Sequence, residues 1–260
     1  MSHLRETAEG YLQHVSQSVL RLSDAALNFV YPPACLLCGR EIPPADADFC
    51  DLCLAQLCPP THAECPRCGA PVGPFANLDK GCGQCRREKF AFDRLIRLGI
   101  YDGQMRMACL RTKAAGGGSL ARGLATLLVN RKRFAFEECR PDLVLPVPEH
   151  WTRRFLHTHY AAEELARHVA RQLRVGVSRS ILMKSRRTPK QATSPTPVRR
   201  QQQQGSFAVR LAQRVAGKRI LLVDDILTTG STASAAARSL KQAGASQVIV
   251  AVVAVSPLRR

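Results

Sequence analysis

The stretch RILLVDDILTTGST, residues Arg219–Thr232, decides the fold of this 260-residue chain. It opens with an uninterrupted apolar run, Ile220–Val223, which is typical of a strand buried on both faces. Two aspartates follow that run, and a short segment rich in hydroxyl groups comes next. From Ser231 to Ala243, apolar residues at helical spacing predict a helix. The stretch is therefore expected to form a strand–loop–helix unit of an α/β protein.

The same alternation of strands and helices fills residues 91–260. Apolar runs predict strands over 94–100, 142–147, 180–183, 218–223 and 247–255, and helical spacing predicts helices over 103–111, 120–134, 160–174 and 231–243. Such alternation forms a mostly parallel sheet with helices on both faces. The segment 184–206 is basic and rich in proline and glutamine, so we expect it to be a mobile loop.

The segment Thr228–Thr232 suits an anionic ligand. Glycine lets the backbone approach a ligand closely, and the N–H groups at the start of a helix attract negative charge. The three threonines and the serine of this segment add hydroxyl donors, and hydroxyl side chains also favour capping of the helix that follows. A phosphate group is the expected occupant.

Asp224 and Asp225 need a different partner, because carboxylates repel phosphate. They are the only acidic residues between Leu165 and Arg260, and they stand at the carboxyl end of a predicted strand, where open α/β sheets bind ligands. Ribose hydroxyls and a hydrated Mg²⁺ suit such a pair. Phosphate, sugar diol and metal together describe a phosphoribosyl ligand. The plainer alternative is that the aspartates only cap a turn.

Eleven cysteines indicate metal binding. Eight of them form four Cys-x-x-Cys pairs, and Cys58, Cys109 and Cys139 stand apart. In order, the eight are Cys35, Cys38, Cys50, Cys53, Cys65, Cys68, Cys82 and Cys85. Tetrahedral Zn²⁺ takes four thiolates, so we expect two structural Zn²⁺ ions, with consecutive pairs sharing an ion as the simplest arrangement and interleaved pairs as the alternative.

The formal net charge of +18 is unusually high. Eight zinc-bound thiolates and two Zn²⁺ ions would lower it to about +14, which is still strongly basic. Such a charge attracts polyanions, either nucleic acid or polyphosphate substrates. A general preference for arginine on solvated surfaces is the alternative cause.

Composition divides the chain into three parts. Residues 1–31 have the apolar spacing of an amphipathic helix, suited to packing on the zinc region or on a second subunit to form an oligomer. Residues 32–90 are rich in cysteine, proline and glycine and form the expected double zinc ribbon, and residues 91–260 form the α/β domain. No apolar stretch is long enough to span a membrane, and no signal peptide is evident, so we expect a cytoplasmic protein.

VDDILTTGST resembles the signature with which type I phosphoribosyltransferases bind phosphoribosyl pyrophosphate (PRPP). Together with the four cysteine pairs, it resembles the ComF family, a double zinc ribbon joined to a phosphoribosyltransferase-like domain of type I fold. The resemblance implies Asp224 and Asp225 as catalytic residues. It implies PRPP binding, with Mg²⁺, by Val223, Asp224, Asp225, Thr228, Thr229, Gly230, Ser231, Thr232, Val147, Pro148 and Lys113.

The resemblance also identifies the basic segment as a flexible loop that closes over the site, through Arg187, Gln191, Arg199 and Arg200. One motif departs from the family pattern. His157–Ala161 reads HTHYA where the family usually has R-G-F/Y-N-Q, which puts the substrate contacts of that motif in doubt. Thr228 stands where purine-salvage relatives commonly have Asp, which is evidence against purine salvage.

Two functions are compatible with these features. The first is an enzyme that transfers a phosphoribosyl group to an unidentified acceptor with release of pyrophosphate. The second is a non-catalytic protein that binds single-stranded DNA during DNA uptake. The intact PRPP signature favours the enzyme, whereas the altered motif at 157–161 and the positive charge favour the binding protein.

Overall fold

The computed structural model describes residues 32–43, 47–59, 63–79, 81–148, 160–184 and 206–256. The chain forms two compact units, Met1–Cys53 and Leu54–Arg260. In the first unit, Ala34 and Glu41 pair as an isolated antiparallel bridge around the first cysteine knuckle. The short helix α2 spans Asp51–Leu57.

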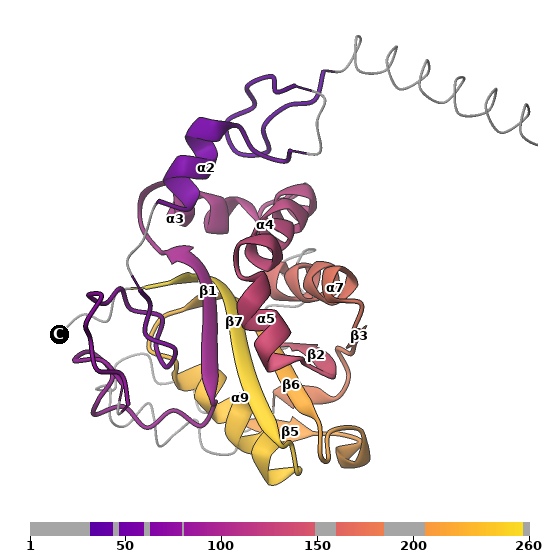
Figure 1. The fold of residues 1–260 in the computed structure, drawn as a ribbon. Coiled ribbons are helices and arrows are strands. Elements are labelled where there is room, and N and C mark those ends of the chain that lie inside the picture. Colours follow the sequence, from indigo (N-terminus) through magenta and orange to yellow (C-terminus); the bar gives the residue numbers. More distant parts are fainter. Residues whose placement is uncertain are drawn as a thin grey trace, which may run out of the picture. The chain divides into compact units, whose positions relative to one another are not determined.

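The larger unit is built on a five-stranded sheet in which every strand is parallel to its neighbours (Figure 1). The strand order is β1-β7-β6-β2-β3. The strands are β1 (Arg94–Ile100), β2 (Leu143–Pro146), β3 (Gly176–Val177), β6 (Arg219–Leu227) and β7 (Gln247–Val255). The helices are α3 (Gly103–Arg111), α4 (Gly118–Arg131), α5 (Arg133–Cys139), α7 (Ala161–Leu173) and α9 (Ser231–Gln242), with a 3₁₀ turn η1 (Ala212–Arg214). The predicted parallel α/β architecture is confirmed.

Helices cover both faces of this sheet (Figure 1). On one face, Ile220 and Leu222 of β6 join Val248 and Val250 of β7 in a core that includes the apolar side of α9. On the other face, α7 packs on β2 and β6, and α4 packs on α7 and β1. The central strands are buried on both sides because apolar residues occupy every position from Ile220 to Val223, as expected for a parallel sheet.

Among the differences from the sequence prediction, three change an element by more than its end residues. The helix expected over 120–134 is two helices, α4 and α5, because the backbone leaves helical geometry at Lys132 (φ −113°, ψ 21°). The strand expected over 218–223 continues to Leu227, because β7 provides pairing partners up to Val255. The strand expected over 180–183 is β4 (Leu182–Lys184), which pairs with the unpredicted β5 (Phe207–Val209) as a separate antiparallel hairpin.

The second cysteine-rich segment packs directly on the edge strand β1. The N–H of Leu95 donates to the carbonyl of Pro66 at 2.8 Å. Arg97, only 1% exposed, donates through Nε to the carbonyl of Gly69, and its guanidinium lies 3.3 Å from a carboxylate oxygen of Glu64. A cation buried inside the edge of the sheet thus ties this ribbon to the α/β core.

Several predicted features lie outside the described residues. These are the N-terminal helix within 1–31, His157–His159 of the altered motif, and loop residues 185–205 with Arg187, Gln191, Arg199 and Arg200. Within the described part of the chain, no helix combines the length and the apolar character that crossing a membrane requires.

Candidate phosphoribosyl site and zinc centres

The aspartate pair lies near the carboxyl end of β6, inside the strand rather than after it. Asp224 pairs in register with Val252 of β7, and Ile226 pairs with Ala254. Both carboxylates turn back onto the backbone: Asp224 Oδ1 accepts from the N–H of Asp225 at 2.9 Å, and Asp225 Oδ1 accepts from the N–H of Ile226 at 2.8 Å. These bonds fix the direction of two adjacent carboxylates at the edge where parallel sheets bind ligands.

Lys113 neutralises part of this negative charge. It lies in the turn between α3 and α4, and its Nζ is 2.6 Å from Asp225 Oδ2. Burial raises the pKa of Asp224 well above its usual value, the charge of Asp225 adds to the rise, and Lys113 opposes it. Asp224 therefore ionises less readily than an exposed aspartate.

The phosphate-loop candidate follows directly. Gly230 has a positive φ of +70° and stands at the N-cap position of α9. The Thr229 and Ser231 hydroxyls lie 2.8 Å apart, at the surface. Glycine at the cap position offers no side chain, and the Thr229 hydroxyl accepts a long hydrogen bond from the N–H of Ser231 at 3.4 Å. The first-turn N–H groups of a helix have no intrahelical acceptor, so this hydroxyl-lined turn can bind an anion.

The segment after β2 borders the same edge. Pro146 pairs with Val223 in register, and the N–H of Val147 donates to the carbonyl of Val223 at 2.9 Å. This bond brings Val147 and Pro148 beside the start of the aspartate pair. Of the predicted PRPP-binding residues, Lys113, Val147, Pro148 and the whole of Val223–Thr232 thus gather at the carboxyl edge of the sheet.

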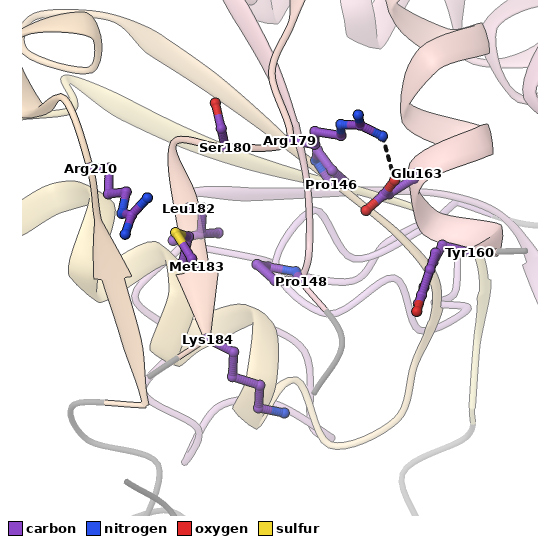
Figure 2. A pocket seen from close by; sticks show the side chains of 10 residues that line it. All are labelled: Pro146, Pro148, Tyr160, Glu163, Arg179, Ser180, Leu182, Met183, Lys184 and Arg210. Carbon is purple, nitrogen blue, oxygen red and sulfur yellow. Dashed lines mark ion pairs between the residues drawn. The ribbon is translucent and has the colours of Figure 1, made fainter. Parts of the chain in front are cut away.

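A pocket of about 260 Å³ opens between the end of β2, the start of α7 and the β4–β5 hairpin (Figure 2). It is lined by Pro146, Pro148, Tyr160, Glu163, Arg179, Ser180, Leu182, Met183, Lys184 and Arg210. Arg179 and Glu163 form an ion pair across it at 3.9 Å, and the Lys184 ammonium lies over the ring of Phe207. The lining therefore combines apolar side chains with the cationic side chains of Arg179, Lys184 and Arg210.

The second cysteine cluster has the geometry of a zinc site. Cys65, Cys68, Cys82 and Cys85 are buried, with Sγ–Sγ distances of 3.7 Å (65–85), 3.5 Å (68–82) and 3.8 Å (82–85). Four sulfurs at about 2.3 Å from a tetrahedral Zn²⁺ stand roughly 3.8 Å apart, which matches these distances. Burial raises the pKa of Cys65, but the N–H groups of Cys82, Arg67 and Cys68 outweigh it and lower that pKa to about 7.

The first cluster repeats this arrangement within its own unit. The sulfur ligand atoms of Cys35, Cys38, Cys50 and Cys53 lie within 4.8 Å of one another. Burial raises the pKa of Cys35, but the backbone N–H groups of Cys38 and Cys50 outweigh it and bring that pKa to about 6, which favours the thiolate. The structure therefore groups consecutive pairs, and the two four-cysteine sites fit a double zinc ribbon. All eleven cysteines are free of disulfides.

Comparison with known families identifies both parts of the chain. Residues 26–86 match the double zinc ribbon domain, and residues 159–260 match the phosphoribosyl transferase domain. The chain is 24% identical over 220 residues to competence protein F of Haemophilus influenzae, covering 83% of this chain and 94% of that protein. The chain thus has the domain combination of the ComF family. It is also 25% identical over 226 residues to the DNA utilization protein YhgH of Escherichia coli K12, covering 84% of this chain and 95% of that protein.

Solved structures with the phosphoribosyltransferase fold are more distant. The adenine phosphoribosyltransferase of Saccharomyces cerevisiae is 21% identical, with a TM-score of 0.35 over 55% of this chain and 70% of that enzyme. The glutamine PRPP amidotransferase of B. subtilis is 24% identical, with a TM-score of 0.31 over 43% of this chain. The aligned part spans 22% of the amidotransferase.

Sequence reasoning missed two groups of residues at this site. The first is the pocket wall formed by Arg179, Lys184 and Arg210, because β5 is too short for a periodicity signal. The second is Phe90 and Ala91, a segment far from the loop in the chain: the Phe90 ring lies against Gly230, and the N–H of Ala91 donates to the Ser234 hydroxyl of α9. The short aromatic pair Phe90 and Phe92, directly after the last cysteine knuckle, was the available signal.

Proposed function

We propose that this protein binds PRPP with Mg²⁺ at the carboxyl edge of the sheet and transfers its phosphoribosyl group to an acceptor, releasing pyrophosphate. One observation carries the proposal: the buried strand β6 delivers two adjacent carboxylates, one of them paired with Lys113, directly before a hydroxyl-rich turn at a helix start. A sugar diol and a phosphate are the chemical groups that such neighbours recognise together.

Each part of the site then has a role. The turn Thr228–Thr232 binds the 5-phosphate through N–H and hydroxyl donors. Asp224 and Asp225 accept hydrogen bonds from the ribose hydroxyls and stabilise positive charge that develops on the ribose ring as pyrophosphate leaves C1. Val147, Pro148 and Lys113 border the pyrophosphate. Bound Mg²⁺ supplies charge neutralisation for the pyrophosphate oxygens.

The pocket beside β2 is the proposed place of the acceptor. Apolar side chains form part of its lining, as in pockets for organic ligands, and that lining includes Pro146 and Pro148 at the end of β2. The predicted loop residues Arg187, Gln191, Arg199 and Arg200 would close over the reacting groups and exclude water. Catalysis of this kind depends on positioning and electrostatics, with no covalent enzyme intermediate.

Calorimetry of PRPP–Mg²⁺ binding tests the proposal. The wild type is expected to bind, and the double variant Asp224→Asn/Asp225→Asn is expected to lose most of that affinity. Equal affinities would refute the assignment. The variant Asp142→Asn is a matched control, because Asp142 pairs with Arg219 at the opposite end of β6. Release of pyrophosphate across a panel of acceptors would then establish turnover.

A second candidate function is binding of single-stranded DNA. It is supported by the net charge of +18 and by relatives whose names refer to competence and DNA utilization. A gel shift with single-stranded DNA that weakens steeply as salt rises would support it. Unchanged mobility at low salt would exclude it. We further propose the cytoplasm as the setting, consistent with eleven cysteines free of disulfides.

A further inference from the structure

Phe90 connects the second zinc centre to the phosphate loop. Its ring packs against the cluster formed by the cysteines of that centre, and it also borders the core of the α/β domain. It stacks on Phe92 with ring centroids 4.8 Å apart and an interplanar angle of 15°. Phe92 is itself buried in the core, so the Phe90 ring is held from two sides.

The same ring lies against Gly230. A Cβ placed on Gly230 would stand 2.8 Å from Cε1 of Phe90, closer than real contacts allow. The Phe90 ring therefore fills the space that a side chain at Gly230 would occupy, and Gly230 is the residue of the loop Thr228–Thr232 with a positive φ. Gly230 has no side chain that could fix its backbone, so the neighbouring atoms decide which of its backbone conformations are allowed.

A hydrogen bond next to the Phe90–Gly230 contact joins the same two segments. The N–H of Ala91 donates to the Ser234 hydroxyl at 2.9 Å, and the N–H of Ser234 closes the first turn of α9 on the carbonyl of Gly230 at 2.8 Å. The residues that follow the zinc ribbon therefore contact both the phosphate loop and the start of its helix.

Hydrogen bonds within the second zinc ribbon hold the residues that lead to Phe90. The N–H of Glu88 donates to the carbonyl of Cys85, and Arg67 donates from its guanidinium to the carbonyl of Glu88 at 2.9 Å. The buried cluster of this ribbon consists of its four cysteines and Ala70, with Val72, Leu78 and Phe90 packed around it. So small a cluster needs the metal to hold its shape.

We propose that Phe90 is a positioning residue, through which the second zinc ribbon holds Gly230 and the start of α9 in the conformation that binds phosphate. This role rests on the proposed PRPP site. It makes the second four-cysteine centre part of the support of that site. Phe90 itself touches no ligand in this scheme.

The test compares PRPP–Mg²⁺ affinity by calorimetry in the wild type, Phe90→Ala and Phe90→Met, with zinc content and melting temperature measured for each. Phe90→Ala is expected to weaken binding about tenfold while retaining its zinc, and Phe90→Met, which keeps an apolar side chain of similar length, to recover most of the loss. The matched control is Phe134→Ala, since Phe134 is 69% exposed on α5. It is expected to bind as the wild type does.

Hydrogen exchange separates positioning from general destabilisation. In Phe90→Ala, the amides of residues 229–234 are expected to exchange faster, whereas those of β6 and β7 keep their protection. Ser234→Ala, which removes only the acceptor for Ala91, should produce a smaller change at the same amides. If the wild type binds PRPP but Phe90→Ala binds equally well with unchanged exchange, the inference is wrong. If the wild type fails to bind PRPP while exchange still quickens at 229–234, the proposed function fails and the coupling stands.

Discussion

Lys113 Nζ lies 2.6 Å from Asp225 Oδ2, so a turn between two helices supplies the cation for the aspartate pair at the end of β6. The contact makes Lys113 a counterion of this pair. If PRPP and Mg²⁺ bind as proposed, the metal ion would supply positive charge at the site, and Lys113 would be able to turn towards the pyrophosphate.

Removing the lysine should change the pH dependence of binding. Lys113 opposes the rise in the pKa of Asp224, so Lys113→Ala leaves that pKa higher and Asp224 protonated to a higher pH. PRPP–Mg²⁺ affinity should therefore rise with pH in both proteins, with the midpoint at higher pH in Lys113→Ala. Affinity near neutral pH should fall about tenfold. Calorimetry across pH measures both effects, and superimposable profiles would contradict the assigned contact.

The Asp224 carboxylate should lower the stability of the folded protein near neutral pH, although the proposed PRPP–Mg²⁺ binding requires it. Its folded-state pKa is raised above its unfolded value, so the folded protein holds the proton more strongly. Stability is then greatest below the unfolded pKa and falls as pH rises towards the folded pKa. Asp224→Asn removes this cost and should raise the free energy of unfolding near pH 7 by on the order of 1 kcal/mol, while PRPP–Mg²⁺ binding is lost. Urea unfolding at pH 5 and pH 7 measures the difference; a less stable variant would show that the carboxylate is better compensated than we infer.

The number of zinc ions bound per chain is a direct test of the two four-cysteine sites. Elemental analysis should find two zinc ions per chain, and Cys68→Ser should leave one. Because the second ribbon packs on β1 through Pro66 and Gly69, that variant should also lower the melting temperature of the α/β unit. One zinc per wild-type chain would refute the double ribbon.

Because Arg97 is a buried cation, two substitutions at its ion pair should cost different amounts of stability. Glu64→Ala removes the carboxylate nearest to a guanidinium that is 1% exposed, and should cost about 3 kcal/mol. Arg97→Met removes the charge together with its need for a partner, and should cost less. Chemical denaturation measures both. The reverse order would mean that the hydrogen bond from Arg97 to Gly69 outweighs the ion pair.

Local patterns predicted most of the fold. The strands over 94–100 and 247–255 have the predicted bounds, because Leu, Ile, Val and Ala dominate both and only Arg94 and Arg97 of β1 are charged. The end of β6 lies beyond its predicted position, because Asp224 and Asp225 look like a strand terminus while β7 goes on pairing with β6 as far as Leu227. Register with a neighbouring strand is a tertiary property, which the charge pattern of one segment does not contain.

The candidate site was predictable from sequence in its loop, Val223–Thr232, and less so in its surroundings. The order of carboxylates, hydroxyls and glycine in Val223–Thr232 indicates its chemistry within one segment. The role of Lys113 was predicted from the family resemblance. Neither the residue pattern nor the resemblance predicted the contact between Phe90 and Gly230. Phe90 meets Gly230 only because the zinc ribbon and α9 converge on the same edge, and spacing within one segment carries no information about such convergence.

Gly230 offers the sharpest test of that convergence. Gly230→Ala places a methyl group 2.8 Å from Phe90 at a φ of +70°, so it combines steric overlap with backbone strain of roughly 1 kcal/mol. Gly217 is the matched control, since its φ is +73° and no atom lies within 4 Å of an added Cβ. Gly217→Ala should lose stability through strain alone and bind PRPP–Mg²⁺ as the wild type does.

Gly230→Ala should lose more stability than Gly217→Ala, and its affinity for PRPP–Mg²⁺ should fall at least about tenfold. In the double variant Gly230→Ala/Phe90→Leu, the smaller side chain relieves the overlap but leaves the strain. Its stability should therefore approach that of Gly217→Ala. Thermal unfolding and calorimetry of these variants beside the wild type separate the two contributions. If the double variant is no more stable than Gly230→Ala, the Phe90 ring does not limit the space behind the loop.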